Sequence, residues 1–420
     1  MAERVVIVGG AIMGSSLAWW LIELGHPPGL VTVVERDPTY AASATAFSNS
    51  CIRQQFGNPL NVAISRFGVE FLKHFQAHMA DDRVPPIHLH PFGYLYLAGD
   101  EAQADRLRRA QAVQAAAGAA TRLLAPGEIA AAWPFFDVDG IVLGSHNPVD
   151  EGYFDGTTMF QWWRRIARER GVTWIDGEAT AIDVAGGRIA GVRLADGTRL
   201  PADIVVNAAG TRGAAVARMA GLDLPVEPRK RYTWVFEAAR PLDRDLPLTI
   251  DPSGVHVRTD GAWYMAGATP ALDPAVDPDD FAGQWDIWEE HVWPAIAARV
   301  PAFEDVRVRR AWVGHYDLNV LDANAILGPH PDLPGFMVMN GFSGHGLQQS
   351  PAMGRGLAEG AWSTRQTGPK PGTGRAAVSW RRRLAPRAAT RAPRSRCVAR
   401  DPCYRLAIGT AGPGHGGPHF

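Results

Sequence analysis

Residues 5–14 of the chain read VVIVGGAIMG, a run of β-branched residues that gives way to glycines. The apolar run predicts a buried strand, and the segment Ile12–Leu24, closed by Gly25, has the composition of a buried helix. A second apolar run, Leu30–Val34, predicts another strand and is followed directly by Glu35. A strand, a glycine turn, a helix and a second strand within about 30 residues make a β-α-β unit, which builds doubly wound parallel sheets.

The glycine turn has the spacing of a dinucleotide-binding motif. In the usual pattern, G-x-G-x-x-G, Gly9 would make the tight turn and Gly14 would let the helix pack closely on the strand. Ala11 stands where the second glycine is usual, so a pyrophosphate would have to accommodate one methyl group. The helix start can bind phosphates, and a carboxylate at Glu35 can accept hydrogen bonds from ribose hydroxyls. The residues that we expect to bind a dinucleotide here are Gly9, Gly10, Ala11, Ile12, Met13, Gly14, Glu35 and Arg36.

The bulk composition limits the classes of protein to consider. A chain of 420 residues is too long for one core, since cores stop growing at roughly 250–300 residues, so we expect two domains. The net charge of −1 does not suit a nucleic-acid-binding protein. Cys51, Cys397 and Cys403 have neither metal-ligand nor disulfide-scaffold spacing, so we expect no metal site and a cytoplasmic location. The apolar stretch Val5–Ile22 is explained by the strand and helix, and no run of about 20 apolar residues predicts a transmembrane helix.

Apolar periodicity divides the rest of the chain into helical and β-rich segments. Helical spacing covers residues 59–80, 101–117, 156–170, 279–299 and 344–362. Short alternating runs predict a hairpin at residues 179–194, one strand at Arg199–Val206 and an antiparallel sheet over residues 226–268. The predicted fold class is α/β, a doubly wound Rossmann-like cofactor domain with an inserted, mainly antiparallel-sheet substrate domain. We assign residues 1–80, 140–225 and 318–362 to the cofactor domain, and residues 81–139 and 226–317 to the substrate domain.

Four further segments carry a resemblance to a known family. Residues 44–56 read ATAFSNSCIRQQF, 205–210 read VVNAAG, 312–329 read WVGHYDLNVLDANAILGP, and 340–348 read NGFSGHGLQ. With the N-terminal motif they resemble the family of D-amino-acid oxidase, glycine oxidase, monomeric sarcosine oxidase and dimethylglycine dehydrogenase over residues 3–362. The likeness is greatest to the branch of the mitochondrial complex I assembly FAD oxidoreductase. The resemblance implies an FAD-dependent oxidoreductase with residues 340–348 beside the isoalloxazine.

The implied FAD site draws on several parts of the chain. Gly344 and Gly346 would allow close backbone approach to the flavin, and the helix start after them would stabilise negative charge on it. We expect noncovalent FAD, because His315 stands where a cysteine tethers the flavin of monomeric sarcosine oxidases, and residues 41–55 lack the histidine used by dimethylglycine dehydrogenases. Cys51 lies off the attachment position, and we favour a small buried residue there. Beyond the N-terminal motif, the predicted FAD residues are Thr45, Ala46, Ser48, Cys51, Ile52, Ala181, Ala208, Ala209, Gly210, Gly314, Gly344, His345, Gly346, Leu347 and Gln348.

The candidates for substrate binding or catalysis are Arg53, His256, Arg258, His345 and Gln348. In sarcosine oxidases an arginine at the place of Arg53 pairs with the substrate carboxylate, and a guanidinium fork suits that geometry. The alternative is an arginine bound to the flavin or to an acid. Gln348 stands where those enzymes place a lysine, so the carboxylate clamp would be built differently. His256 and Arg258 are predicted on a strand facing either the flavin or solvent, and His345 is either a catalytic base or, as we favour, a residue that shapes its loop.

The chemistry that the family implies is amine oxidation. We expect hydride transfer from a secondary or tertiary amine, or an N-substituted amino acid, to flavin N5, which gives an imine that hydrolyses. Met265 aligns with the lysine that activates oxygen in sarcosine oxidases, which favours a dehydrogenase with another, unknown electron acceptor. The alternative is a flavin-binding assembly factor acting through protein partners, and an NAD-dependent dehydrogenase gives GFSGHG no role. We expect a monomer or small homo-oligomer with a small-molecule substrate and no nucleic-acid partner.

The C-terminal tail differs from the rest of the chain. The resemblance stops near Trp362, and residues 361–420 contain twelve Lys or Arg against one acid, Asp401. Such a segment, without apolar periodicity, cannot bury enough surface to offset its ordering entropy. We predict a disordered basic tail over residues 363–420. It is a nucleic-acid or membrane-surface arm, a linker or, as we favour, an out-of-frame reading of a GC-rich gene.

Overall fold

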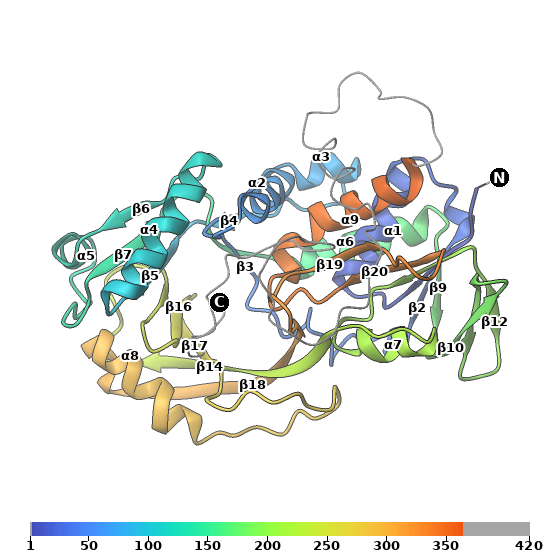
Figure 1. The fold of residues 1–420 in the computed structure, drawn as a ribbon. Coiled ribbons are helices and arrows are strands. Elements are labelled where there is room, and N and C mark those ends of the chain that lie inside the picture. The colour runs from blue at the N-terminus through green and yellow to red at the C-terminus, as the bar shows by residue number, and fades with distance from the viewer. Residues whose placement is uncertain (1, 364–420) are drawn as a thin grey trace, which may run out of the picture.

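A computed structural model describes residues 2–363, so the predicted tail from residue 364 onward lies outside the described residues. Two large sheets dominate these residues (Figure 1). The six-stranded sheet has the order β19-β20-β13-β1-β2-β9, and the eight-stranded sheet has the order β18-β14-β17-β16-β15-β5-β7-β6. The α/β fold class, with one doubly wound sheet and one mainly antiparallel sheet, is confirmed.

The six-stranded sheet is built around β1 (Val5–Val8), which pairs in parallel with β2 (Val31–Glu35) and β13 (Ile204–Asn207). Alternate residues of β1 pack into different hydrophobic cores. Val5 and Ile7 belong to one core, and Val6 and Val8 belong to the core on the opposite face of the sheet. Both faces are therefore covered, which is why this strand has no polar residue. The sheet is completed by β9 (Thr173–Asp176), β20 (Phe336–Asn340) and the antiparallel edge strand β19 (Ile326–Pro329).

Helices and a small sheet cover the two faces of this sheet. Five helices contribute to the core that contains Val5 and Ile7: α1 (Ile12–Glu23), α2 (Pro59–Lys73), α3 (Phe75–Met79), α6 (Gly156–Glu169) and α9 (Gly346–Ser363). The opposite core includes α7 (Gly213–Met219) and a three-stranded sheet of β10 (Ala179–Ala185), β11 (Arg188–Leu194) and β12 (Arg199–Pro201). The helix α1 contacts α9 and α6, and in Figure 1 these three lie together over the sheet.

The eight-stranded sheet is antiparallel except where β15 (Leu248–Ile250) runs parallel to β5 (Tyr94–Ala98). Its longest strands, β14 (Val226–Ala238) and β18 (Val306–Asn319), extend toward the first sheet and contact the short turn Gly210–Arg212 there (Figure 1). A separate core, with Trp234, Phe236 and Trp288, packs against one face of this sheet. Its other strands are β6 (Arg122–Leu124), β7 (Leu143–Asn147), β16 (His256–Asp260) and β17 (Trp263–Ala268).

The remaining elements are short or peripheral. A three-stranded sheet joins β3 (Cys51–Ile52), β8 (Gly152–Phe154) and β4 (Leu89–His90). The helices outside the two cores of the six-stranded sheet are α4 (Glu101–Ala116), α5 (Pro126–Ala132) and α8 (Trp293–Arg299). Within residues 2–363, no helix has both the length and the apolar character needed to cross a membrane.

Two predicted elements differ from the structure. The single strand predicted at Arg199–Val206 is two strands, β12 and β13, because the chain leaves one sheet after Pro201 and enters another at Ile204. The helix predicted over residues 279–299 begins only at Trp288, as a π-helical turn that continues into α8. Residues 276–283 instead form neither helix nor strand and contact β14 and the segments after β2 and β13; we call these residues the strap. The assignment of residue ranges to two domains remains a prediction; β7, placed with the cofactor domain, pairs in the eight-stranded sheet.

The start of α1 tolerates only glycine at two positions. A Cβ on Gly14 would lie 1.9 Å from the carbonyl oxygen of Gly9, and Gly9 itself has a φ of 100° with the Ala208 carbonyl beside it. We predict that Gly14→Ala lowers the thermal unfolding midpoint and the FAD content. The added methyl group would force the backbone at Gly9 to move, at a cost of about 1–3 kcal/mol or more.

Gly360→Ala is the matched control, since a Cβ at this exposed helical glycine meets no atom of another segment within 4 Å among the described residues. It should leave FAD content unchanged and add about 0.5–1 kcal/mol of stability through helix propensity. Equal unfolding midpoints for the two variants would contradict the close packing of helix and turn.

Candidate active site

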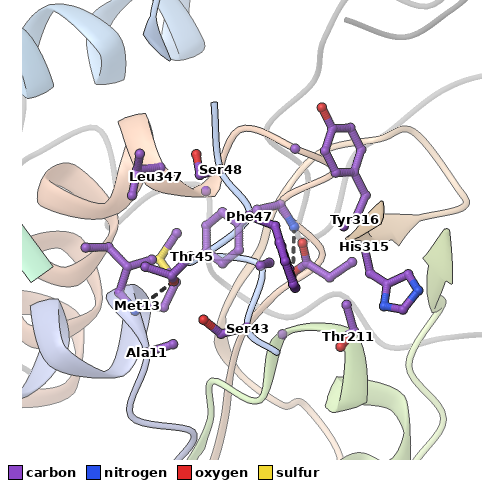
Figure 2. Close-up of a pocket in the computed structure, with 18 of the residues that line it drawn as sticks. Ala11, Met13, Ser43, Thr45, Phe47, Ser48, Thr211, His315, Tyr316 and Leu347 are labelled. Carbon is purple, nitrogen blue, oxygen red and sulfur yellow. Dashed lines mark hydrogen bonds between the residues drawn. The ribbon is translucent and has the colours of Figure 1, made fainter. Parts of the chain in front are cut away.

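One large cavity lies between the two sheets, with a volume of about 380 Å³. Figure 2 shows Ala11, Met13 and Thr45 on one side of it, His315, Tyr316 and Thr211 on the other, and Phe47 between them. Most of the predicted site residues line this cavity. They are Gly9, Ala11, Ile12, Met13, Glu35, Arg36, Thr45, Ser48, Cys51, Arg53, Ala208, Ala209, Gly210, His256, Gly314, Gly344, His345, Gly346, Leu347 and Gln348.

Six predicted site residues do not line the cavity: Gly10, Gly14, Ala46, Ile52, Ala181 and Arg258. The Gly10 N–H donates to Glu35 Oε2 over 2.8 Å, so this glycine shapes the turn behind the cavity wall. Ile52 is fully buried in the core under α2. The side chain of Arg258 lies behind the wall, where it bonds Asp260 and the Asn49 carbonyl.

The dinucleotide end of the cavity suits a pyrophosphate. The N-cap residue of α1, Ala11, makes no side-chain cap, and the first turn has no acidic residue. The Ile12 N–H donates to Thr45 Oγ1 over 3.3 Å, and Ile12 and Met13 line the cavity, so a phosphate there would meet the N-terminus of the helix. The Glu35 carboxylate is 9% exposed and accepts hydrogen bonds from the N–H groups of Gly10 and Asp37. Burial is the main cause that raises its pKa. These residues fit the adenosine and pyrophosphate of FAD, and the oxygens of Glu35 retain lone pairs for ribose hydroxyls.

The loop at residues 341–346 is held by a buried carboxylate that the sequence patterns did not single out. Asp317 Oδ2 accepts hydrogen bonds from the N–H groups of Gly341, at 2.9 Å, and Phe342, at 3.1 Å. Burial raises the pKa of Asp317 to about 6. Gly344 has a φ of 88°, and a Cβ there would lie 2.3 Å from the Tyr316 ring. The loop is thus fixed tightly before α9 begins, and His345, Gly346 and Leu347 are presented to the cavity.

Arg53 is buried at the other end of the cavity, with 5% exposure. Its Nη1 donates to the Tyr96 hydroxyl, and its Nη2 lies 2.7 Å from Nε2 of His345. In the described part of the chain, no carboxylate forms an ion pair with this guanidinium. Because a guanidinium only donates, Nε2 of His345 must accept, which places the imidazole proton of a neutral His345 on Nδ1. The lone pair on Nε2 of His345 accepts from Arg53 and is not available to take a proton from a substrate. This arrangement suits a positioning role for His345.

A buried polar network fixes the backbone next to Arg53. Glu151, fully buried on the loop between β7 and β8, accepts hydrogen bonds from the Gln54 N–H at 2.6 Å, Asn147 Nδ2 at 2.9 Å and Gln55 Nε2 at 3.1 Å. Burial raises the pKa of Glu151 to about 7. Gln55 also donates to the Tyr94 carbonyl, so the network ties the Arg53 segment to β5. No local spacing marks Glu151, because two of its partners, Gln54 and Gln55, come from a distant segment of the chain.

Other predicted residues have specific surroundings. His256 lines the cavity with Nε2 3.4 Å from the Asn49 amide, and burial, with nearby Arg258, lowers its pKa to about 4. Cys51 lines the cavity and its thiol donates to the Asn49 carbonyl over 3.4 Å. Burial raises the pKa of this thiol. Met265, which the sequence aligns with the oxygen-activating lysine, is buried and does not line the cavity.

The strap at residues 276–283 crosses the dinucleotide end of the cavity. Asp279 forms ion pairs with Arg36, which follows β2, and Arg212, which precedes α7. Phe281 packs on Phe47 and His315, with ring centroids 5.5 and 4.4 Å apart. Asp280 of the strap also pairs with Lys230 on β14. The strap therefore connects the eight-stranded sheet with the chain segments that follow β2 and β13 in the six-stranded sheet. Among the described residues, no group of His, Cys, Asp or Glu is arranged to hold a metal ion.

Comparisons with known proteins agree with this geometry. Residues 4–360 match the family of FAD dependent oxidoreductases, DAO. The chain is 37% identical over 390 residues to FAD-dependent oxidoreductase domain-containing protein 1 of Bos taurus, covering 84% of this chain and 80% of that protein. It is 26% identical over 373 residues to mitochondrial sarcosine dehydrogenase of Homo sapiens, covering 84% of this chain but 39% of that protein. The crystal structure of L-proline dehydrogenase from P. horikoshii is similar with a TM-score of 0.75 and 25% identity, covering 87% of this chain and 94% of that one.

We predict that Asp279→Asn accelerates FAD release by about two- to ten-fold, because two partly exposed ion pairs, each contributing up to about 1 kcal/mol, are lost. The measurement is the recovery of FAD fluorescence after dilution of the holoprotein. Asp286→Asn is the control, since Asp286 is exposed and makes no ion pair within the described residues, while the change in net charge is the same. Equal release rates for the two variants would show that the strap does not retain the cofactor.

Proposed function

Because this chain belongs to the family of FAD-dependent oxidoreductases, we propose that it oxidises a secondary or tertiary amine or an N-substituted amino acid. The single observation that carries the proposal is the buried Arg53 guanidinium, which lines the same cavity as the dinucleotide turn and has no carboxylate partner in the described chain. A buried cation without a counter-ion is costly, and a substrate carboxylate would supply that counter-ion. The names of sarcosine dehydrogenase and L-proline dehydrogenase, both similar to this chain, support a secondary amino acid.

The residues of the chain would bind and orient the substrate. Arg53 would hold the carboxylate, while Tyr96 and His345 keep its guanidinium in place. FAD, when bound, supplies the acceptor for a hydride from the carbon next to nitrogen. The nitrogen lone pair forms the C=N bond as the hydride leaves, which gives an iminium ion, and water adds to its carbon to give a carbonyl compound, an amine and a proton. The buried end of the cavity would limit the access of water until this step.

Within the described residues, no lysine lines the cavity: Lys73 is on α2 and Lys230 is tied to Asp280. An ammonium group next to the flavin would favour reaction with oxygen by stabilising superoxide, and its lack supports a dehydrogenase over an oxidase. The proposal of a dehydrogenase therefore rests on the residues that line the cavity, because Met265 is not among them.

We retain the cytoplasmic location, and a monomer or small homo-oligomer, as predictions.

The surroundings of two residues support noncovalent FAD. The Cys51 thiol has a raised pKa and is engaged with a carbonyl, so it is a poor nucleophile. His315, at the position of the tethering cysteine, has Nε2 2.9 Å from the Asp280 carbonyl oxygen, so this nitrogen is engaged with the backbone. Acid precipitation of the purified protein should therefore release all flavin into the supernatant, and flavin absorbance that stays with the pellet would contradict this expectation.

Anaerobic mixing with amines tests the function itself. Sarcosine, dimethylglycine, proline and larger N-methyl amino acids are added to the holoprotein, and loss of absorbance near 450 nm reports flavin reduction. Reduction by at least one of these compounds is the expected result. A protein that binds FAD but keeps it oxidised with every amine would instead fit the alternative of a flavin-binding assembly factor.

We predict that Arg53→Lys raises KM by about ten-fold or more, because an ammonium keeps the charge but loses the fork that binds a carboxylate. Arg299→Lys is the control, since Arg299 is also largely buried but lies outside the cavity, where it forms an ion pair with Asp251. The flavin spectrum of both variants should match that of the native protein. An unchanged KM for Arg53→Lys would remove Arg53 from the substrate site.

A further inference from the structure

The wall of the cavity beside Arg53 is an apolar surface built from two strands far apart in the sequence. β5 and β15 are parallel neighbours, with Tyr94 opposite Leu248 and Tyr96 opposite Ile250. Because side chains alternate along a strand, these four residues share one face of the sheet. All four line the cavity, and we call them the apolar platform.

The apolar platform is a packed unit. Tyr94, Leu248 and Ile250 form a cluster of buried residues with Tyr96 packed against it. The rings of Tyr94 and Tyr96 lie nearly parallel, at 21°, with centroids 6.4 Å apart. The alternate residue Leu95 faces the separate core on the far side of the sheet. The platform is therefore held from behind and presents aromatic and branched surface to the cavity.

The guanidinium of Arg53 lies at the edge of this platform. Its Nη1 donates to the Tyr96 hydroxyl, and its central carbon is 5.7 Å from the Tyr96 ring centroid. An anion bound to Arg53 would thus be next to apolar surface, and the rest of the same molecule would extend over it. A carboxylate with an apolar substituent matches this arrangement in both parts.

The charges around the platform exclude other substituents. Arg231 also lines the cavity, but Asp273 neutralises it through two hydrogen bonds of 2.8 and 3.0 Å. His256, across from Ile250 on β16, is neutral at pH 7 because burial lowers its pKa to about 4. A second carboxylate on the substrate would therefore find no free cation there among residues 2–363.

The cavity also offers no anion for a positively charged substituent at the platform. Its acidic lining residues at the dinucleotide end are Glu35, Asp37, Glu178 and Asp279. The remaining lining carboxylate in the described chain, Asp317, is buried under the loop and occupied by backbone N–H groups. A lysine-like substituent would be desolvated without a partner, which is unfavourable.

We propose that the substrate is an N-alkyl amino acid with a single carboxylate, held by Arg53, and a large apolar or aromatic substituent that packs on the apolar platform of Tyr94, Tyr96, Leu248 and Ile250. This proposal rests on the proposed function for the oxidation itself, and it adds the class of side chain. It sets the chain apart from an enzyme that acts on the smallest amino acids, for which an apolar surface of this size has no use.

The first test measures substrate preference on the holoprotein. N-methylphenylalanine and N-methylleucine, each as both enantiomers, are compared with sarcosine, N-methylaspartate and N-methyllysine, where the last carries its methyl group on the α-nitrogen. The concentration dependence of anaerobic flavin reduction gives an apparent Kd for each. The apolar compounds should bind about ten-fold tighter or more, the gain expected from burying a large apolar side chain. Sarcosine or N-methylaspartate binding as tightly as both apolar compounds would overturn the inference while leaving the proposed function in place.

A second measurement keeps the inference independent of turnover. Binding of 3-phenylpropionate, acetate and succinate, none of which is an amine, is followed through the change in the spectrum of the oxidised flavin. 3-Phenylpropionate should bind about ten-fold tighter or more than the other two. If it does while no amine reduces the flavin, the proposed function fails and the ligand class stands. If the three acids bind equally, the ligand class fails.

Variants on one strand assign the preference to the platform. Ile250→Thr keeps a β-branched residue and removes apolar surface, so the preference for 3-phenylpropionate over acetate should fall several-fold. Thr249→Val is the matched control, because Thr249 is on the same strand, is buried, and does not line the cavity. A preference that both variants leave unchanged, with the native flavin spectrum, would show that the platform does not bind the substituent.

Discussion

The turn at Gly9–Gly14 brings three chain segments closer together than any side chain would allow. The Gly14 Cα faces the Gly9 carbonyl, and Gly9 faces the carbonyl of Ala208 at the end of β13. This contact places the first turn of α1 at the carboxyl ends of the parallel strands, where ligands bind in open α/β sheets. Glu35, at the end of β2, then reaches the Gly10 N–H and closes the turn from the other side. The position of the cofactor end of the cavity follows from this contact.

The opposite end of the cavity depends on a buried charge. Arg53 donates hydrogen bonds to acceptors on three side chains, namely the Tyr96 hydroxyl on β5, Nε2 of His345 before α9 and Oε1 of Gln348, which accepts the Arg53 backbone N–H over 2.9 Å. Desolvating a guanidinium is costly, and the neutral acceptors around it recover part of that cost without cancelling the charge. Glu151 holds the adjoining backbone and lies close enough for the positive charge of Arg53 to lower its pKa in part. A positive site is thus maintained beside the apolar platform.

The sequence predicted those features of the site that come from residues close together in the chain. The strand, turn, helix and acid at residues 5–35, and the loop at residues 340–348, are contiguous patterns, and the structure brings both to one cavity. Features that depend on pairing between distant segments were not predicted. The apolar platform needs β5 beside β15, about 150 residues later, and the strap needs Asp279 between Arg36 and Arg212. Arg258 shows the same limit: alternation placed it on a strand, but only the fold shows its side chain behind the wall with Asp260.

The two ends of the cavity differ in charge, and this difference would orient a ligand. The dinucleotide end is lined by the carboxylates Glu35, Asp37, Glu178 and Asp279 and by Arg36 and Arg212, which pair with Asp279, and bound FAD would fill it. The end at Arg53 has a cation without an ion pair among the described residues. A substrate carboxylate would therefore be attracted to Arg53, and salt screens this buried site weakly. The loop at Gly344 lies between the two ends, fixed by Asp317, so a molecule anchored on Arg53 would place its nitrogen and neighbouring carbon toward that loop. Binding and orientation would then be achieved by one charged group and a surface that accepts the remainder of the molecule.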